Sequence, residues 1–422
     1  MTSTGPTDYL SAEFTRRGLH GIRPGLERIA TVLDELGRPQ DHLGRIIHLA
    51  GTNGKGSTAA FLESILRAAG CTTAMMTSPH LMCITERIRV SGTPVSQSTF
   101  EAAARQVATA ETIRKTVLTG FEFLTAAGFL VMAQSHPAYS IVETGLGGRL
   151  DATNVMDSAL SILTPIALDH TVYLGPTPEA IAAEKVGITR PNRPCITARQ
   201  SDGVTSVIES HAHCHGITLL SEGADFAATG SDLNWNFVDR DRCVKSLRLG
   251  LPGLFQVQNA ALATAAAAQF LTPETWRTAV LSGVPAACWP GRFDLRQIDG
   301  QSILFDGAHN PAGLKAFISA FRQRYSDSPH VLCALKKDKD ADGMLNQLEE
   351  FAAGLIVTSP GTVEGLAPGS VAARISGIPV TCEPDPVTAL NLLLHRDNSG
   401  IKVVCGSLYL VGYLLAALPP RE

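Results

Sequence analysis

Short apolar runs alternate along the chain with longer segments in which apolar residues recur at helical spacing. Residues 46–50 form such a run and predict a buried strand, and 57–69 predict a helix just after a glycine-rich segment. Other runs predict a parallel sheet with helices between its strands. The further strands are 140–143, 159–164 and 195–198, and the helices include 25–36, 100–111 and 259–270. This alternation predicts an α/β fold.

The same alternation continues beyond a segment, 287–293, whose proline and glycine are typical of a linker. It predicts a small doubly wound, Rossmann-like unit. Its strands are expected at 302–306, 330–335, 354–358 and 402–405, and its helices at 311–324, 343–353 and 387–395. A chain of 422 residues is long for one core, so we expect two domains, 1–291 and 292–422.

Composition narrows the classes of function. The formal net charge is −4, which argues against a nucleic-acid partner, because no basic excess is available to displace counterions. The nine cysteines are odd in number and widely spaced, as in a protein of a reducing compartment. We find no signal peptide and no apolar run that could span a membrane. We expect a soluble, cytoplasmic monomer with small-molecule partners, no nucleic acid and no membrane.

The glycine-rich segment from Gly51 to Ser57 lies between a predicted strand and a predicted helix. In such a turn, backbone N–H groups and the helix amino end can hold phosphate. Lys55 can reach a terminal phosphate, and the hydroxyl of Ser57 lies where a Mg²⁺ ligand belongs. Gly56 separates these two residues, so the strict Walker pattern is not met. The segment still predicts a nucleotide site.

A carboxylate, Glu143, ends the next predicted strand, at the edge where open α/β sheets bind ligands. It suits Mg²⁺, which takes one or two carboxylates together with phosphate oxygens. The alternative is that Glu143 merely pairs with Arg149. The residues alone do not decide between the two interpretations.

Other polar residues have ordinary structural explanations. His170 follows an apolar strand and could be a metal ligand or simply be hydrogen-bonded in place. Lys185 lies on a predicted helix and would by default be a solvated surface lysine. Asp306 could contact a ribose and His309 a phosphate, but turn formation is the usual role of such residues. The cluster His211, His213, Cys214 and His215 favours a polar surface over a metal site.

Together, these stretches resemble the folylpolyglutamate synthase/dihydrofolate synthase family of the Mur ligase superfamily. The resemblance covers nearly the whole chain in register. It includes 25–29, 48–58, 77–81, 86–88, 121–123, 143–154, 167–170, 183–185, 251–253, 259–261, 290–293, 306–311, 338–340 and 405–407. It implies an ATP-binding P-loop domain of the Mur ligase central-domain type over 1–291 and a Rossmann-like ligase domain over 292–422.

The resemblance also implies an activity, ATP-dependent addition of L-glutamate to dihydropteroate and/or folate in folate biosynthesis. A substrate carboxylate attacks the γ-phosphate of ATP, and glutamate then attacks the acyl phosphate. By resemblance the catalytic residues are Lys55, Lys185 and His309. The implied ATP-binding residues are Gly54, Lys55, Gly56, Ser57, Asn259, Arg292 and Asp306. The implied Mg²⁺ ligands are Ser78, Glu143, His170 and a carbamylated Lys185.

The pterin-bearing acid is expected to lie where an aromatic face can stack on its flat ring. By resemblance the residues are Phe121, Glu122, Phe123, Leu124, Leu150, Asp151 and Ala152. From the residues alone, Phe121 and Phe123 would be ordinary core residues. ATP is expected to bind between the two domains, with domain closure assembling the site.

The chain departs from the family pattern near the end expected to bind glutamate or nucleotide. It has Glu364-Gly365-Leu366-Ala367-Pro368 instead of an arginine followed by Ala-Leu-Pro, Lys336-Lys337 instead of a glycine-rich lead-in, and Phe255 instead of a polar residue. A second hypothesis is therefore a Mur-type ligase for a different acid or amine. A third hypothesis, a nucleotide-binding module without catalysis, is disfavoured by the presence of Lys55, Glu143, His170, Lys185 and His309.

Overall fold

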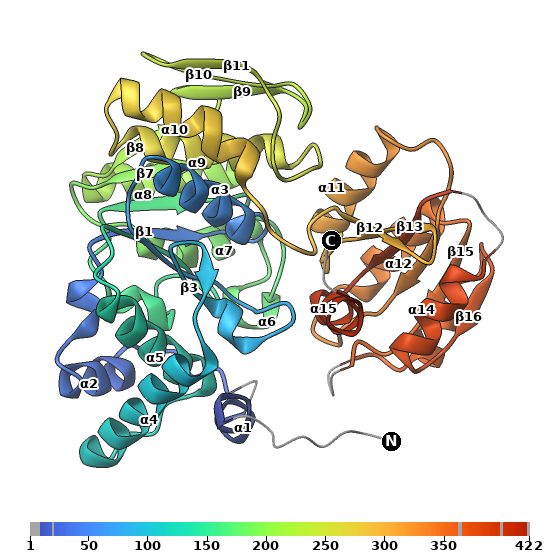
Figure 1. Cartoon of the computed structure of the whole chain (residues 1–422), viewed down its shortest axis with the longest axis horizontal. Coiled ribbons are helices and arrows are strands. Elements are labelled where there is room, and N and C mark those ends of the chain that lie inside the picture. Colours follow the sequence, from blue (N-terminus) through green and yellow to red (C-terminus); the bar gives the residue numbers. More distant parts are fainter. Residues whose placement is uncertain (1–8, 19–20, 362–364, 397–399, 420–422) are drawn as a thin grey trace.

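The structure, a computed structural model, describes residues 9–18, 21–361, 365–396 and 400–419. Residues 1–8, in which we expect no signal peptide, lie outside these ranges. The described residues form two largely parallel sheets flanked by helices and one small antiparallel sheet (Figure 1). The predicted α/β class, a mostly parallel sheet followed by a smaller doubly wound sheet, is confirmed.

The large sheet has the strand order β4-β3-β2-β5-β1-β6-β7-β8. Its strands are β1 (Arg45–Ala50), β2 (Thr73–Met76), β3 (Ile88–Val90), β4 (Thr93–Pro94), β5 (Tyr139–Glu143), β6 (Leu160–Leu163), β7 (Pro194–Thr197) and β8 (Thr218–Ser221). The pairings β2–β3 and β3–β4 are antiparallel and the others are parallel. The predicted strands of this region correspond to β1, β5, β6 and β7.

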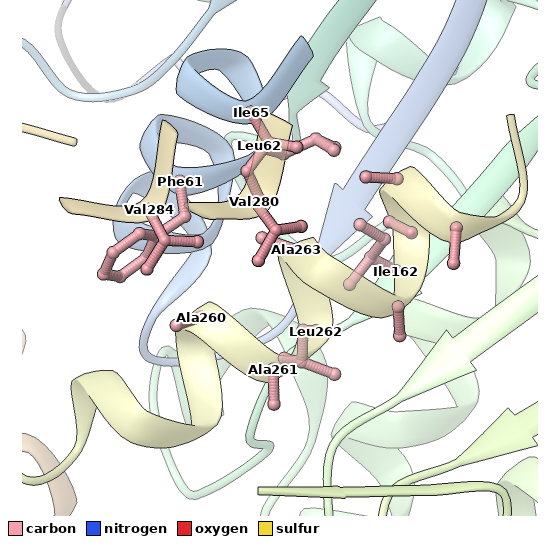
Figure 2. Close-up of a cluster of buried hydrophobic side chains, with 14 of the residues drawn as sticks. Phe61, Leu62, Ile65, Ile162, Ala260, Ala261, Leu262, Ala263, Val280 and Val284 are labelled. Atoms are coloured by element: carbon pink, nitrogen blue, oxygen red, sulfur yellow. The ribbon is translucent and has the colours of Figure 1, made fainter. Parts of the chain in front are cut away.

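Alternate residues of β1 face opposite layers of helices, as the period of two in a strand requires. Ile47 and Leu49 lie in one hydrophobic core, part of which is shown in Figure 2, with helices α3, α9 and α10. Ile46 lies in the other core, with α2, α4 and α5. These helices are α2 (Glu27–Glu35), α3 (Lys55–Ala68), α4 (Gln97–Arg114), α5 (Gly120–Gln134), α9 (Gln256–Ala268) and α10 (Pro273–Ala286). Three more helices belong to this unit: α1 (Tyr9–Arg16), α7 (Pro178–Lys185) and α8 (Asp202–His215).

Small residues bring α9 and α10 close to α3. The buried face of α9 is largely alanine, including Ala260, Ala261 and Ala263 (Figure 2). On α10, a Cβ at Gly283 would lie 2.7 Å from both the Cα of Ile65 and the carbonyl oxygen of Ser64. The Ser64 hydroxyl donates to the Gly283 carbonyl at 2.7 Å. The core beneath the glycine-rich loop is therefore close-packed through backbone as well as side chains.

The small sheet, order β11-β10-β9, was not predicted. Its strands are β9 (Phe226–Gly230), β10 (Trp235–Asp239) and β11 (Cys243–Leu247), and it lies over α9 and α10 at the top of Figure 1. The indole N–H groups of Trp235 and Trp276 donate to backbone carbonyls of α9 at 3.1 and 3.0 Å. Only one or two residues of each strand are buried, so none shows the continuous apolar run of a central parallel strand.

The second large sheet has the order β12-β13-β17-β14-β15-β16. Its strands are β12 (Asp294–Ile298), β13 (Gln301–Phe305), β14 (His330–Cys333), β15 (Gly354–Val357), β16 (Val380–Cys382) and β17 (Lys402–Cys405). Its helices are α11 (Pro311–Arg322), α12 (Ala341–Phe351), α13 (Pro368–Ala372), α14 (Pro386–Leu394) and α15 (Leu408–Ala417). Helices α11, α12 and α13 cover one face, and α14 and α15 the other.

Short elements complete the described chain: α6 (Thr171–Leu174) and the 3₁₀ helices η1 (Pro39–His42), η2 (Ile84–Arg87), η3 (Ala152–Val155) and η4 (Val186–Ile188). The second sheet begins at Asp294, beside the predicted boundary. Whether 1–291 and 292–422 behave as separate domains stays a prediction. Among the described helices, none combines the length and apolar character needed to cross a membrane.

Candidate active site

A cavity of about 340 Å³ lies between the two large sheets, within the volume range of small-molecule sites. The first sheet's unit contributes the glycine-rich loop, the end of β5 and the segment after β6, and the second contributes the segment after β13 and the start of α11. The cavity brings together all the residues predicted to act in catalysis, to bind ATP or to bind metal. These are Gly54, Lys55, Gly56, Ser57, Ser78, Glu143, His170, Lys185, Asn259, Arg292, Asp306 and His309.

The glycine-rich loop is shaped for a close approach between two helix ends. Gly54 has φ 90°, in the left-handed region, and precedes the first residue of α3. A Cβ at Gly54 would overlap the side-chain oxygen of Asn259, on the first turns of α9. Asn259 Nδ2 donates to Gln256 Oε1 at 2.8 Å, and Gln256 Nε2 donates to Ser57 Oγ at 3.3 Å. The amino ends of α3 and α9 are thus joined by hydrogen bonds at the cavity.

Lys55 turns back onto its own loop. Its Nζ donates to the carbonyl oxygens of Gly51 at 3.0 Å and Thr52 at 3.4 Å, and it lies 3.8 Å from Glu143 Oε1. The ammonium group is therefore on the cavity wall, between the glycine-rich loop and Glu143.

Glu143 is buried at the carboxyl end of β5. It accepts the backbone N–H of Ser78 at 3.3 Å, and burial raises the pKa of its carboxyl above the ordinary value, against the attraction of Lys55. The alternative that Glu143 merely pairs with Arg149 is wrong. Arg149 pairs instead with Glu184, at 2.8 Å.

Lys185 is buried, only 4% exposed, so its interpretation as a solvated surface lysine is also wrong. Its Nζ donates to the Gly51 carbonyl at 2.9 Å, the same oxygen that accepts from Lys55. Burial, and next the charge of Lys55, lower the pKa of the Lys185 amine to about 7. Much of this amine is therefore neutral near pH 7.

Asp169 and His170 meet a lysine from the second sheet's unit. Lys339 Nζ donates to Asp169 Oδ1 at 2.6 Å and lies 3.2 Å from His170 Nε2. Burial alone would raise the pKa of Asp169, but Lys339 holds it well below its usual range. Burial, together with Lys339, lowers the pKa of His170 to about 4. The motif stretches 167–170 and 338–340 contain these residues, but Asp169 and Lys339 were not predicted as site residues.

Two asparagines also join the units at this cavity, Asn53 of the glycine-rich loop and Asn310 at the start of α11. Their side-chain amides exchange hydrogen bonds at 3.1 and 3.2 Å, and Asn310 Nδ2 also donates to Asp169 Oδ2 at 3.1 Å. Both residues lie inside the motif stretches, but neither was predicted as a site residue, because each looks like an ordinary turn residue.

His309 and Asp306 line the cavity on the second sheet's side. His309 Nδ1 lies 2.8 Å from the Gly307 carbonyl and is assigned as the protonated nitrogen, so Nε2 faces Asp169 at 3.9 Å. Burial and Lys339 lower the pKa of His309 to about 4. Asp306 accepts the backbone N–H groups of Phe293 and Ala308, both at 2.8 Å, so its expected turn role is present alongside its position in the cavity.

The residues predicted to hold the pterin-bearing acid do not line this cavity. Phe123, Leu124 and Ala152 are buried in the hydrophobic core, and Glu122 caps α5 and pairs with Arg28 at 2.9 Å. Asp151 is also buried and accepts backbone N–H groups. The remaining two, Phe121 and Leu150, are partly exposed. This arrangement does not support direct contact through the buried side chains, and substrate contact for the set stays a prediction.

The histidine-rich cluster lies away from the cavity. His211, His213, Cys214 and His215 are on α8, where His211 bonds Thr189 and stacks on His215. Among the described residues, no group of three or more His, Cys, Asp or Glu is placed to hold a metal ion. Of the departures, Glu364 lies outside the described residues, whereas Gly365 forms an isolated bridge with Lys336.

The site fits ATP and a divalent metal. A glycine with positive φ precedes a helix whose amino end lines the cavity, and a lysine lines the cavity beside it. A buried carboxylate that accepts one backbone N–H lies within 4 Å of that lysine. Of the four predicted metal ligands, only Glu143 and His170 carry side chains of the types that usually bind metals. Lys185 would have to gain a carboxylate to join them.

Comparison with known proteins agrees with this geometry. The Mur ligase middle domain family matches residues 49–267, and the Mur ligase glutamate ligase domain matches 291–408. The dihydrofolate synthase/folylpolyglutamate synthase of Bacillus subtilis (strain 168) is 34% identical over 408 residues, 93% of this chain and 94% of that protein.

Solved structures are similar over the same extent. Mycobacterium tuberculosis folylpolyglutamate synthase complexed with ADP and AMPPCP matches with a TM-score of 0.88 and 29% identity, over 98% of this chain and 100% of that one. A bifunctional folylpolyglutamate synthase/dihydrofolate synthase with Mn, AMPPNP and L-glutamate bound matches with a TM-score of 0.87 and 29% identity, over 99% of both chains. The chain therefore belongs to the folylpolyglutamate synthase/dihydrofolate synthase family of Mur ligases.

Proposed function

We propose that this chain is an ATP-dependent ligase that adds L-glutamate to dihydropteroate and/or folate and releases ADP and phosphate. One observation carries the proposal: the glycine-rich loop, the buried Glu143 and the buried Lys185 face one cavity between two sheets. The relatives with nucleotide, manganese or L-glutamate bound support the same activity.

The triphosphate would lie along the amino end of α3, where Gly54, Gly56 and Ser57 line the cavity. Lys55 would leave the Gly51 carbonyl and bind the terminal phosphate. Asn259 and Arg292 would hold the nucleotide from either side, with Asp306 near the ribose. The helix amino end favours this anion electrostatically.

Mg²⁺ would be held by Ser78, Glu143, His170 and Lys185, the last as a carbamate. When bound, the ion neutralises charge that develops on the phosphate oxygens. Lys339 lies 3.2 Å from His170 Nε2, so His170 would have to exchange this partner to serve as a ligand through that nitrogen.

Carbamylation would give Lys185 the carboxylate that this role needs. The neutral amine attacks the carbon of CO₂, an N–C bond forms, and one proton leaves the nitrogen. The lowered pKa of Lys185 supplies the neutral amine near pH 7. The charge changes from positive to negative, which turns a residue that repels Mg²⁺ into one that binds it.

Catalysis would consist mainly of positioning and charge stabilisation. The acid's carboxylate attacks the γ-phosphate, and ADP leaves. The glutamate amine then attacks the acyl carbon of the acyl phosphate, an amide forms and phosphate leaves. His309, neutral at pH 7, would lie beside the reacting phosphates. Phe121 and Leu150, the exposed members of the predicted substrate set, would contact the acid.

The test is ADP release with two acceptors. The protein is supplied with ATP, Mg²⁺ and L-glutamate together with either dihydropteroate or a tetrahydrofolate, and each reaction is repeated without L-glutamate. We expect glutamate-dependent ADP release with at least one acceptor, and its absence with both would refute the proposal.

A second candidate keeps the ATP step and changes the acid or the amine. The departures at Gly365 and Lys336 motivate it. These two residues form an isolated β-bridge close to the Asp338–Lys339 segment, in which Lys339 contacts His170 at the cavity. A screen of carboxylic acids and amines by ADP release would distinguish it from glutamate ligation.

A further inference from the structure

A buried series of hydrogen bonds runs from β1 to the loop that follows Glu143. His48 Nε2 lies 2.8 Å from Thr153 Oγ1, and Thr153 Oγ1 donates to Asp151 Oδ1 at 2.6 Å. Asp151 Oδ2 accepts the backbone N–H of Leu146 at 2.7 Å. All three side chains are buried. Leu146 itself lines the cavity, so the series ends at the cavity wall.

The direction of these bonds follows from the donors available. Thr153 has one hydroxyl hydrogen and gives it to Asp151, so its oxygen accepts from His48 and the Nε2 of His48 carries the hydrogen. The other ring nitrogen, Nδ1, is buried and has no hydrogen-bond partner among the described residues. An unsatisfied buried polar atom costs free energy, and an aliphatic residue at this strand position would avoid that cost.

Helix capping does not account for the series. Asp151 caps η3 by accepting the backbone N–H of Thr153 at 3.0 Å, which needs only one of its oxygens. The bond to Leu146 and the buried histidine are additional. Their common effect is to fix the loop over 144–150 to the strand that carries the glycine-rich loop.

This loop lies against Lys185 on its other side. A Cβ at Gly148 would lie 2.8 and 2.9 Å from the carbonyl oxygens of Glu184 and Lys185, and the Arg149 backbone N–H donates to the Glu184 carbonyl at 2.8 Å. Glu143 is at the other end of the loop. One short loop therefore starts at Glu143 and rests on the backbone of Lys185.

We propose that His48 and Thr153 are positioning residues that set the separation of Glu143 from Lys185 by fixing the loop over 144–150. The inference rests on the proposed function for the roles of these two side chains. Loss of the series lets the loop shift, which weakens divalent-metal binding and lowers kcat more than it changes KM for the acid. Supporting residues behind metal ligands typically contribute about 10- to 100-fold in affinity or activity.

The experiment compares two pairs of variants of the full chain: Thr153→Val with Thr153→Ser, and His48→Leu with His48→Gln. The second member of each pair keeps a hydrogen-bonding group at the same place. Thr264→Val is the control, because the Thr264 hydroxyl is buried and has no partner among the described residues. The readouts are the Mn²⁺ Kd by electron paramagnetic resonance, kcat and KM, Tm, and backbone hydrogen exchange over 144–150.

We expect Thr153→Val and His48→Leu to raise the Mn²⁺ Kd about tenfold or more and to speed exchange over 144–150, with most of the effect restored in Thr153→Ser and His48→Gln. Thr264→Val should leave the Mn²⁺ Kd unchanged.

The proposal is wrong if the apolar variants bind Mn²⁺ as the wild type does, if Mn²⁺ does not bind the wild type, or if all five variants lose affinity in proportion to Tm. If one pair fails to fold, the other decides by the same criteria. A wild type that binds Mn²⁺ but shows no glutamate-dependent ADP release would contradict the proposed function alone.

Discussion

At the scale of single residues, two lysines share one neutral acceptor, the carbonyl oxygen of Gly51. Lys185 and Lys55 donate to it at 2.9 and 3.0 Å. Burial penalises the charge on Lys185 most strongly, and repulsion by the Lys55 ammonium adds to it, so the pKa of Lys185 falls to about 7. A neutral amine of this kind is the form that carbamylation, as proposed for Lys185, requires.

Replacing Lys185 by alanine tests its proposed role as a metal ligand. We expect Lys185→Ala to lower ADP release by about 100-fold or more, because the metal site loses the ligand that the carbamate of Lys185 is proposed to supply. With ¹³C-labelled bicarbonate, the wild type should show a carbamate signal in ¹³C NMR that the variant lacks. Lys245→Ala removes an exposed lysine and serves as the control. Full activity of Lys185→Ala would rule out the role.

His48 should make stability depend on pH. Burial lowers the pKa of His48 to about 3 in the folded chain, whereas the unfolded chain has the ordinary value of about 6.5. Below pH 6.5 the unfolded state binds more protons than the folded state. The contribution of His48 is therefore fully present above 6.5 and is lost as the pH falls toward 3, by about 1.4 kcal/mol per pH unit.

The measurement is the free energy of unfolding of wild type and His48→Gln by denaturant titration at pH 7 and pH 5. We expect the wild type to lose about 2 kcal/mol more than the variant over this interval. Other buried histidines contribute equally to both proteins and cancel in the comparison. Equal losses in the two proteins would mean that His48 titrates normally.

Which site residues could be predicted depends on where their partners lie. Lys55, Glu143 and His309 follow predicted strands or glycine-rich stretches, so local pattern and family resemblance together identified them. Lys339 could not be found in this way, because its partner Asp169 lies 170 positions earlier. Local pattern also gave the wrong environment for Lys185, because it does not show that the glycine-rich loop and the loop after Glu143 pack against this end of the helix.

At the scale of elements, β2 and the long helices α5 and α10 were not predicted. Most of the central parallel strands and several long helices were predicted, with ends that differ by a few residues. These strands are buried on both faces and therefore appear as continuous apolar runs. The strands β9, β10 and β11 bury only one or two residues each, and their pattern of exposure is irregular. The cover over α9 and α10 was therefore missed, although Trp235 and Trp276 gave a signal for it as large aromatic residues that need a buried place.

Close packing of α10 on α3 gives a prediction at this scale. Gly283→Ala should destabilise the chain by about 1–3 kcal/mol, because the new Cβ meets the backbone of α3, which cannot rotate away. Gly369→Ala is the matched control, since Gly369 is also helical and its Cβ would meet nothing within 4 Å. Unfolding by denaturant measures both. A Gly283→Ala variant as stable as Gly369→Ala would show that the helices can separate freely.

At the scale of the whole molecule, polar contacts between the two large units gather at the cavity. Lys339 bonds Asp169, and Asn53 and Asn310 bond each other. A further ion pair, outside the cavity, joins Arg324, just after α11, to Asp232, between β9 and β10. The sequence predicted a site between two domains, but not the pairs that hold them together, because each pair joins residues from distant parts of the chain.

Removing Lys339 should shift the molecule toward a more open arrangement. The Lys339–Asp169 pair is almost fully buried, and breaking such a pair costs on the order of 3–5 kcal/mol in the closed arrangement. We expect a larger radius of gyration for Lys339→Met than for the wild type in small-angle X-ray scattering without ligands. Lys337→Met, at an exposed neighbour, should scatter as the wild type does. Identical scattering from all three proteins would show that this pair does not hold the units.

The alanine-rich face of α9 has a consequence for how the chain tolerates change. Alanine has no rotatable side-chain torsion, so folding costs this interface little side-chain entropy. For the same reason its side chains cannot change rotamer to make room for a larger neighbouring side chain. The helices on either side carry the glycine-rich loop and Asn259 at their amino ends. A larger side chain in this layer would therefore displace the helices as rigid bodies. Enlarging substitutions there should reduce nucleotide affinity as well as stability.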